Sequence, residues 1–216
     1  MGKNILFVSP TGTLDNGAER SITNLMVYLA HLDYNVFNVY PENGHPTHRA
    51  YRDKLQDAGV KLFPLTTVKW WWEEAPGNLL LSKEERVLFY HKNIQDIRDI
   101  ISKNKIELVI SNTANVFQGA LAAACESVPH FWLIHEFPER EFAYYVEKFD
   151  FMLDNSDEVF AVQGNLKKSL EKFGNRNHKL QSFIPFTEIS DESLGKGEQI
   201  RIVSIGLINE NKNQME

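Results

Sequence analysis

The sequence predicts an α/β protein of the doubly wound, Rossmann-like type, in which a mostly parallel sheet carries helices on both faces. Short runs rich in β-branched and aromatic residues recur along the chain, and segments with helical periodicity separate them. The runs are apolar on both of their faces, as is typical of strands that helices cover on each side. Such a β-α alternation is the pattern of a doubly wound sheet. The predicted strands are residues 4–8, 35–40, 60–63, 106–110, 130–134, 158–162 and 180–184.

Apolar stripes at spacings of three and four residues predict helices between these strands. Ser82 and Glu85 have the spacing of a capping box, which predicts where the second striped helix begins. Each stripe is expected to face the core. The stripes are Ile22, Leu25, Met26, Leu29 and Leu32; Val87, Tyr90, Ile94, Ile97 and Ile101; and Val116, Phe117, Ala120, Leu121 and Ala124.

The composition is that of an ordinary globular protein, with 216 residues of which 43% are apolar. Its formal net charge of −6 gives no basic surface for a nucleic-acid backbone, so nucleic acid is not expected as a partner. The only cysteine, Cys125, lies in an alanine-rich stretch that predicts a buried helix face, and this cysteine usage fits a reducing cytoplasm. No segment reaches the roughly 20 apolar residues of a membrane span. We therefore expect a cytoplasmic protein, with a peripheral place at the inner face of the membrane as an open alternative.

A change in composition near residue 186 predicts a domain boundary. Residues 1–185 form the first domain, and the polar segment 186–199 reads as a linker between domains. Residues 200–216 then predict the first strand and loop of a second domain. A second Rossmann-like half would need far more chain than this, so we expect these residues to be the N-terminal part of a longer protein.

The loop of residues 9–19 joins the first strand to the first helix and is a candidate anion site. Free N–H groups and the positive end of the helix dipole meet there, and Gly12 and Gly17 allow a ligand to approach the backbone. In the alternative interpretation, Asn16 only caps the helix, and Glu19 returns as its capping-box partner. The loop has neither the Walker pattern nor Gly-x-Gly-x-x-Gly, although Glu42 after the second strand could imitate the acid that binds the ribose of a dinucleotide.

Three loops are expected to meet at the crevice between the first and fourth strands, which are neighbours in the commonest doubly wound order. They are residues 9–19, 111–115 and 135–141. Asn112 and Thr113 carry groups suited to sugar hydroxyls, although a helix cap ahead of Val116 explains them equally well. His135 stands at the end of an apolar strand, where a neutral or protonated imidazole could donate a hydrogen bond to a ligand; a purely structural role is the alternative.

Trp70, Trp71 and Trp72 cannot all point into one core from a regular strand or helix, so at least one is expected to be exposed. An exposed ring could stack on a sugar or rest among lipid headgroups, which makes Trp71 and Trp72 candidate acceptor-binding residues. Packing under a long loop is the alternative. His45 and His48 lie in a turn with no cysteine or carboxylate at zinc-ligand spacing, and residues 135–141 lack a second histidine, so no metal site and no metal cofactor are expected.

An ordered set of segments resembles the N-terminal domain of the GT-B-fold glycosyltransferases of glycosyltransferase family 4. "KNILFVSP" is similar to the opening strand, and "NGAERSITNLMVYLAHLDYNVFNVY" resembles the family's Gly-Gly-Ala-Glu-Arg turn, helix and second strand. "WLIHE" resembles the strand end that bears its histidine, and "VFAVQGNLKKSLEKFG" the helix before the crossover between domains. "RIVSIGLINENKNQ" is similar to the first strand and loop of the nucleotide-sugar domain.

The resemblance implies roles for individual residues. Asn16, Gly17, Ala18 and Glu19 would face the donor's diphosphate or sugar, and His135 would contact the donor sugar as a catalytic residue. Lys212 matches the lysine that stabilises the leaving phosphate. Gly12, Asn112, Thr113, Trp71 and Trp72 would then lie on the acceptor side. Two departures stand out: Asn16 replaces the first glycine of the pair, and Leu207 stands where the family often has arginine.

The resemblance also implies the reaction of the full-length protein: transfer of a hexose or similar sugar from a nucleotide diphosphate sugar to a glycan or lipid-linked acceptor, with retention of configuration and without a metal. The Glu-x7-Glu segment of the donor side would lie beyond residue 216, so this chain alone is expected to be inactive. Two rival interpretations remain: an NAD-type oxidoreductase or epimerase domain, and a non-catalytic sugar-binding module that works with a partner chain.

Overall fold

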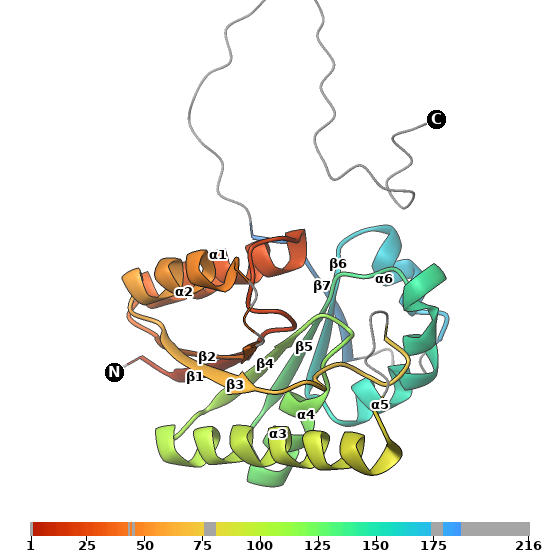
Figure 1. Ribbon diagram of the computed structural model, residues 1–216. Helices are drawn as coiled ribbons and strands as arrows, with labels where there is room; N and C mark the ends of the chain where they lie inside the picture. Colours follow the sequence, from red (N-terminus) through yellow and green to blue (C-terminus); the bar gives the residue numbers. More distant parts are fainter. Residues whose placement is uncertain (1, 43, 45, 76–80, 174–178, 187–216) are drawn as a thin grey trace, which may run out of the picture.

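The computed structural model describes residues 2–42, 44, 46–75, 81–173 and 179–186, which form a seven-stranded sheet in the order β3-β2-β1-β4-β5-β6-β7 (Figure 1). Every neighbouring pair of strands is parallel. The predicted doubly wound sheet is therefore confirmed, as is the pairing of the first strand with the fourth. The strands are β1 (Asn4–Val8), β2 (Asn35–Glu42), β3 (Lys61–Thr66), β4 (Leu108–Asn112), β5 (His130–Ile134), β6 (Glu158–Val162) and β7 (Leu180–Phe183).

Helices cover both faces of this sheet. The pair α1 and α2 lies on one face and the pair α3 and α4 on the other (Figure 1). The 3-10 helix η1, α5 and α6 follow in the C-terminal half of the described chain. Their bounds are α1 (Gly17–His31), α2 (His48–Asp57), α3 (Lys83–Asn104), α4 (Gln118–Glu126), η1 (Arg140–Lys148), α5 (Phe149–Asp154) and α6 (Asn165–Leu170).

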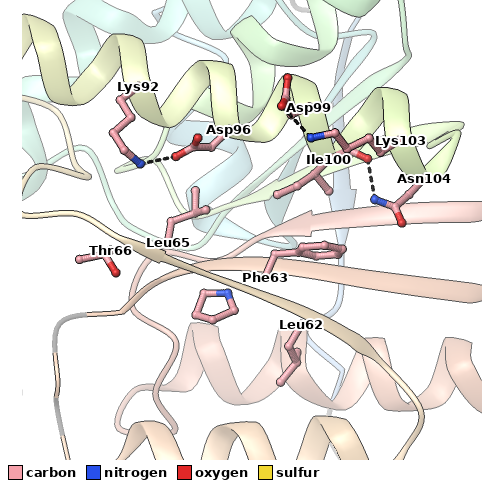
Figure 2. A pocket seen from close by; sticks show the side chains of 11 residues that line it. Leu62, Phe63, Leu65, Thr66, Lys92, Asp96, Asp99, Ile100, Lys103 and Asn104 are labelled. Carbon is pink, nitrogen blue, oxygen red and sulfur yellow. Dashed lines mark hydrogen bonds and ion pairs between the residues drawn. The ribbon is translucent and has the colours of Figure 1, made fainter.

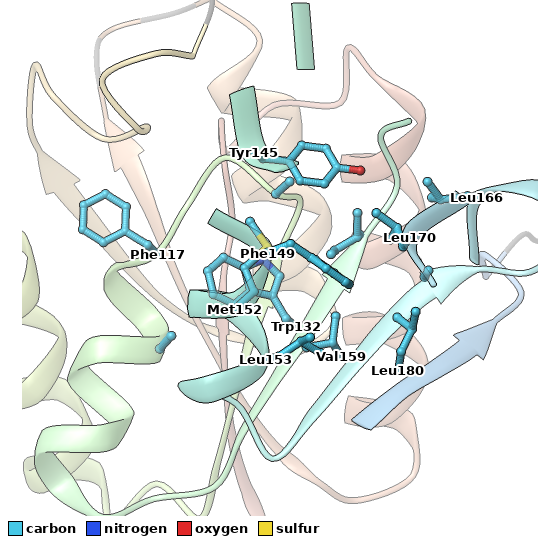
Figure 3. Close-up of a cluster of buried hydrophobic side chains, with 14 residues drawn as sticks. Phe117, Trp132, Tyr145, Phe149, Met152, Leu153, Val159, Leu166, Leu170 and Leu180 are labelled. Carbon is cyan, nitrogen blue, oxygen red and sulfur yellow. The ribbon is translucent and has the colours of Figure 1, made fainter. Parts of the chain in front are cut away.

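The core is divided by the sheet. One buried cluster lies between the sheet and the pair α1 and α2, and another lies beneath α3 and α4. A third cluster of buried side chains includes Trp132 of β5 together with Tyr145, Phe149 and Met152 (Figure 3). Trp132 also donates a hydrogen bond from Nε1 to the carbonyl of Thr113, at 2.8 Å. This cluster fixes the end of β4 relative to β5.

The helix stripes are only partly confirmed. Ile97 and Ile101 of α3 are buried, but Val87 is 62% exposed because it lies in the first turns of that helix, ahead of the part that packs on the core. Leu32 is the residue that follows α1, and it is also exposed. Cys125 is exposed as well, so the predicted burial of this residue is wrong; the buried face of α4 is formed by residues such as Ala122 and Ala123.

Two local predictions concern the ends of elements. The capping box of α3 is confirmed, since Ser82 Oγ accepts from the Glu85 N–H and Glu85 returns to the Ser82 N–H. The fourth strand begins at Leu108 and not at Ile106, because the Ile106 N–H bonds to the carbonyl of Ile101 in the turn that closes α3. The predicted linker beyond residue 186, the strand from residue 200, Leu207 and Lys212 lie outside the described residues.

Candidate functional site at the carboxyl ends of β1, β4 and β5

The three loops predicted to converge do meet at the carboxyl ends of β1, β4 and β5. Asn112, the last residue of β4, links the other two: its Nδ2 donates to the carbonyl of Ala18 in α1 at 3.4 Å, and its Oδ1 lies 3.0 Å from Nε2 of His135. The parallel register between β1 and β4, which places Val8 beside Ser111, brings these ends together. The predicted residues Asn112 and His135 are thus in direct contact next to the start of α1.

Asn16 caps α1. It has extended backbone angles, and its Oδ1 accepts from the Glu19 N–H at 2.8 Å. The second half of the predicted capping box is wrong, because Glu19 does not return to Asn16. Its Oε1 accepts instead from the backbone N–H groups of Thr11 (2.7 Å) and Gly12 (2.9 Å) and from the Thr11 hydroxyl. The carboxylate therefore holds the loop between β1 and α1 in place, because it accepts hydrogen bonds from N–H groups that have no strand partner.

Glu19 is fully buried, and burial raises the pKa of its carboxyl from 4.5 to about 7, against the opposing effect of the Thr11 and Gly12 hydrogen bonds. Because the pKa is higher in the folded than in the unfolded chain, this group's contribution to stability is complete below pH 4.5. It is lost as the pH rises towards 7, which removes roughly 3 kcal/mol.

Glu19→Gln tests this assignment, since glutamine keeps the acceptor oxygen but does not ionise. We expect the free energy of unfolding of the variant, relative to the unchanged protein, to rise between pH 5 and pH 8 by up to about 3 kcal/mol. Urea unfolding of both proteins at the two pH values measures this difference. If the two proteins respond equally to pH, Glu19 is not the buried titrating group that we describe.

Glycine is needed for different reasons at the two glycine positions, Gly12 and Gly17. Gly12 has φ +67°, and a Cβ built there would lie 2.3 Å from Cδ2 of Tyr40, so the fold itself requires glycine at this position. Gly17 is the first residue of α1, and a Cβ there would meet nothing within 4 Å. The fold alone therefore does not explain why residue 17 is glycine. A ligand that approaches the backbone closely at this position would explain it.

Alanine substitutions separate these causes. We expect Gly12→Ala to destabilise the fold by roughly 1–3 kcal/mol, because it combines a positive φ with a steric clash against Tyr40. Gly17→Ala should leave the midpoint of thermal unfolding unchanged or raise it, since alanine favours a helix more than glycine does. Thermal unfolding of the two variants measures this difference in stability. A large loss of stability in Gly17→Ala would mean that the fold requires this glycine too.

A cavity of about 680 Å³ opens beside Gly17 and His135. This volume is within the range of small-molecule sites, roughly 300–1,000 Å³. The residues that line it come from the first loop, α1, α2, the end of β5 and the segment after β7, and they include Arg20 and Lys54, which the sequence did not single out. The described lining is Leu14, Gly17, Arg20, Ser21, Asn24, Lys54, His135, Pro185 and Phe186.

A second hollow, of about 470 Å³, lies between β3 and α3 (Figure 2). Its lysines are paired with aspartates one turn away on the same helix: Lys92 lies 2.6 Å from Asp96, and Lys103 lies 2.9 Å from Asp99. The described residues that line it do not belong to the converging loops. It is therefore not the candidate site.

His135 is uncharged at neutral pH, because burial lowers its pKa from 6.5 to about 4. Asn112 Nδ2 donates to Ala18, so its Oδ1 faces His135 as an acceptor, and this pairing assigns the proton to Nε2 of the imidazole. Nδ1 is then an acceptor. The ring is also held edge-on against Phe183, with 5.1 Å between the ring centroids. The prediction of an imidazole that donates to a ligand changes accordingly: Nδ1 is suited to accept from a hydroxyl.

Asn112 and Thr113 are both buried, with exposed fractions of 0% and 3%. Thr113 has φ 71°, and its Oγ1 accepts from the Asn115 N–H at 3.3 Å. The alternative interpretation as a helix cap is wrong for both residues, because α4 begins only at Gln118 and its cap position is Phe117. Asn112 orients His135, whereas the predicted contacts of Asn112 and Thr113 with an acceptor stay predictions.

The tryptophan run is not exposed. Trp70 is 6% exposed, Trp71 and Trp72 are half-buried, and each indole N–H donates to a main-chain carbonyl. Successive side chains on this irregular segment reach different partners, which is why the predicted exposed ring is wrong. The acceptors are the carbonyls of Ser9 (3.0 Å), Pro10 (2.8 Å) and Ala114 (2.9 Å), in chain order. The run therefore joins the loop after β1 to the loop after β4.

Glu136 is a structural residue of the site that was not predicted from the sequence. Its Oε2 accepts from the N–H groups of Ala114 (3.1 Å) and His135 (3.2 Å), and burial raises the pKa of this carboxyl. The hydroxyl of Tyr145 donates to the Glu136 carbonyl at 2.6 Å. An acidic residue two positions after the end of an apolar strand was the available signal for such a role.

Comparison with known proteins identifies this arrangement. The parallel sheet, with a cavity where the first helix begins, is a Rossmann-like domain of the GT-B type. The sequence model of Glycosyltransferase Family 4 matches residues 15–182. The chain therefore belongs to glycosyltransferase family 4, as the resemblance of its motifs predicted. No curated protein matches the chain.

Solved structures share the fold at low sequence identity. A glycosyltransferase from Rickettsia africae is 16% identical with a TM-score of 0.58, over 85% of this chain and 43% of that protein. HepE from Anabaena, solved in complex with UDP, is 14% identical with a TM-score of 0.56, over 84% and 44%. A UDP-GlcNAc 2-epimerase from Neisseria meningitidis, bound to UDP-GlcNAc, is 16% identical with a TM-score of 0.53, over 83% and 46%. The chain thus spans less than half of each.

Two further observations concern partners. Among the described residues, no helix has both the length and the apolar character needed to cross a membrane. The same part of the chain holds no group of three or more His, Cys, Asp or Glu side chains arranged to bind a metal ion. A metal-independent reaction and a peripheral membrane location stay predictions.

Proposed function

We propose that the full-length protein is a retaining glycosyltransferase that moves a sugar from a nucleotide diphosphate sugar to a glycan or lipid-linked acceptor, and that this chain supplies the acceptor side. The observation that carries the proposal is the meeting of Gly17 and His135, from α1 and the end of β5, at one cavity. Membership of glycosyltransferase family 4 supports it. So do structures of the same fold that were solved with UDP or UDP-GlcNAc bound.

In this proposal the start of α1 faces the donor. Asn16 caps this helix, and Gly17 and Ala18 open its first turn, where backbone N–H groups and the helix dipole favour the diphosphate. The buried Glu19 acts indirectly by holding the loop before them. Lys212, outside the described residues, would offset the charge of the leaving phosphate, so that these groups replace a divalent ion.

The acceptor would enter from the same cavity. Nδ1 of His135 is available to accept from a sugar hydroxyl near the reacting carbon. Among the predicted acceptor residues, Asn112 contributes by orienting His135. Gly12, Thr113, Trp71 and Trp72 are proposed to shape the surrounding loops, since their described contacts are mostly with main-chain groups. Without the second domain the chain would not turn over, and we place the protein in the cytoplasm at or near the membrane's inner face.

The dinucleotide alternative has less support. Glu42, which would have to bind a ribose, lies 2.8 Å from Arg52 and 3.5 Å from Nδ1 of His48, both on α2. An epimerase keeps some support from the shared fold of the UDP-GlcNAc 2-epimerase, although that likeness shows the fold alone.

A donor screen with the full-length protein tests the proposal. A panel of nucleotide diphosphate sugars is incubated with neutral and anionic sugar acceptors, and both nucleotide diphosphate release and the sugar products are followed. We expect release that depends on an acceptor, with a new glycosidic product. Conversion of the donor to its epimer without transfer would favour the epimerase, and sugar binding without any conversion would favour the non-catalytic module.

A further inference from the structure

The cavity beside Gly17 has an unusual charge for this protein. Arg20 of α1 and Lys54 of α2 both line it, and none of the described residues that line it is acidic. The chain as a whole carries a net charge of −6. In the hollow under β3, by contrast, each lysine has an aspartate partner (Figure 2). The local excess of positive charge at the site is therefore a particular property of this cavity.

Neighbouring polar groups hold both cations in place. Nε of Arg20 donates to the carbonyl of Leu14 at 2.6 Å, and Nζ of Lys54 donates to Oδ1 of Asn24 at 2.6 Å. These bonds use one donor on each side chain, which leaves the two terminal NH2 groups of the guanidinium and two ammonium hydrogens. Within the described part of the chain, neither cation has a carboxylate at ion-pair distance. Both are positioned, and neither is neutralised.

The two cations lie at different distances from the donor end of the cavity. Arg20 is three residues beyond Gly17 and bonds back to Leu14, so its guanidinium lies near that end, whereas Lys54 lies further from it. Asn24, which holds Lys54, is seven residues beyond Gly17, about 10 Å along the helix axis. The volume of about 680 Å³ is sufficient for a sugar between these points. The apolar side chains of Leu14 and Phe186 complete the described wall.

We propose that Arg20 and Lys54 form a subsite for an anionic group, phosphate or carboxylate, on the sugar acceptor. This inference rests on the proposed function and narrows its acceptor class. Arginine binds such groups through paired N–H donors, and lysine adds a point charge. A neutral acceptor would leave both cations, the exposed Arg20 and the half-buried Lys54, without a counter-charge at the site. The same chemistry would suit the donor's diphosphate, so the test has to distinguish the two sources.

Binding of small probes to the full-length protein tests the subsite without requiring turnover. Glucose 6-phosphate, glucuronic acid and glucose are titrated by calorimetry at low ionic strength. We expect at least one of the two anionic sugars to bind about tenfold or more tightly than glucose. Arg20→Gln and Lys54→Gln should each weaken that binding by about tenfold, the value of one charge-assisted hydrogen bond. Arg20→Lys, which keeps the charge, should restore most of it.

Arg49→Gln is the matched control, because Arg49 lies on α2 with Lys54, carries the same charge and is not among the cavity residues. It should change the affinity by less than twofold. The inference is overturned if glucose binds as well as both anionic sugars, or if the Arg20 and Lys54 variants bind like the Arg49 variant. Circular dichroism and thermal unfolding confirm that each variant is folded.

Repeating the titrations with UDP, GDP or ADP present identifies the source of the anion. Simultaneous binding of a nucleotide diphosphate and the anionic sugar is expected. If a nucleotide diphosphate displaces the sugar, and the Arg20 and Lys54 variants lose affinity for that nucleotide, the cations serve the donor and the inference fails. If no nucleotide binds, the proposed function loses its donor, whereas the subsite is still decided by the variants.

Discussion

Replacing His135 with alanine in the full-length protein is expected to lower the rate of sugar transfer by roughly 10²–10³-fold, the usual effect of removing one well-placed polar group from an active site. The imidazole lines the cavity beside Gly17, and Asn112 and Phe183 fix its orientation. The ring is half-buried, so its loss should leave the fold intact. Initial rates under saturating donor and acceptor measure the effect, with circular dichroism as a check on folding.

His91→Ala is the matched control, because His91 is an exposed histidine on α3 and is not among the described cavity residues. Its rate should stay within twofold of the unchanged protein. An equal rate for the His135 and His91 variants would remove His135 from the site. The pH profile gives an independent check: since the pKa of His135 is lowered to about 4, its protonation should not affect the rate between pH 6 and pH 8. The lowered pKa also affects stability. As the pH falls from 6.5 towards 4, the unfolded chain binds a proton at His135 and the folded chain does not, so the free energy of unfolding decreases.

Replacing Trp70 with alanine is expected to destabilise the protein by about 3–5 kcal/mol, as for other large buried aromatic side chains. The indole packs in the cluster beneath α3 and α4, and its N–H donates to the Ser9 carbonyl at the end of β1. The main-chain carbonyl of Trp70 accepts from Nε2 of Gln118 at 2.5 Å, and the substitution keeps this group. Equilibrium unfolding in urea gives the free energy.

Trp70→Phe separates packing from hydrogen bonding in this second experiment. Phenylalanine keeps most of the apolar volume and loses the N–H, so a cost of about 1–3 kcal/mol is expected, with Ser9 left without this donor. If Trp70→Ala lowers the free energy of unfolding by less than 1 kcal/mol, the tryptophan run does not hold the loop after β1 to the core.

The regular parts of the fold could be predicted from sequence because their periodicity is strong. Residues 130–134 and 158–162 are strands with the predicted bounds, and both lie inside the parallel sheet. The tryptophan run could not be predicted correctly, since it follows neither a strand nor a helix and each ring finds its own carbonyl. The partner of Glu19 was also wrong, because the unpaired N–H groups of Thr11 and Gly12 depend on the path of a loop.

The candidate site was predictable to the extent that topology determines it. Parallel strands end at the same edge, so the pairing of β1 with β4 placed Asn112 near α1. Lys54 lies on a different helix, and only the packing of α2 beside α1 brings it to the cavity with Arg20. No pattern in the sequence links these two cations.

The most direct test of the account is the configuration of the transferred sugar. The full-length protein is supplied with the nucleotide sugar that the donor screen selects and with a phosphate- or carboxylate-bearing acceptor, and the anomeric signals are followed by NMR. We expect release of nucleotide diphosphate in step with a new glycosidic bond of the donor's own anomeric configuration. An inverted linkage would contradict the retaining mechanism, and a donor that is epimerised without transfer would contradict the assignment as a glycosyltransferase.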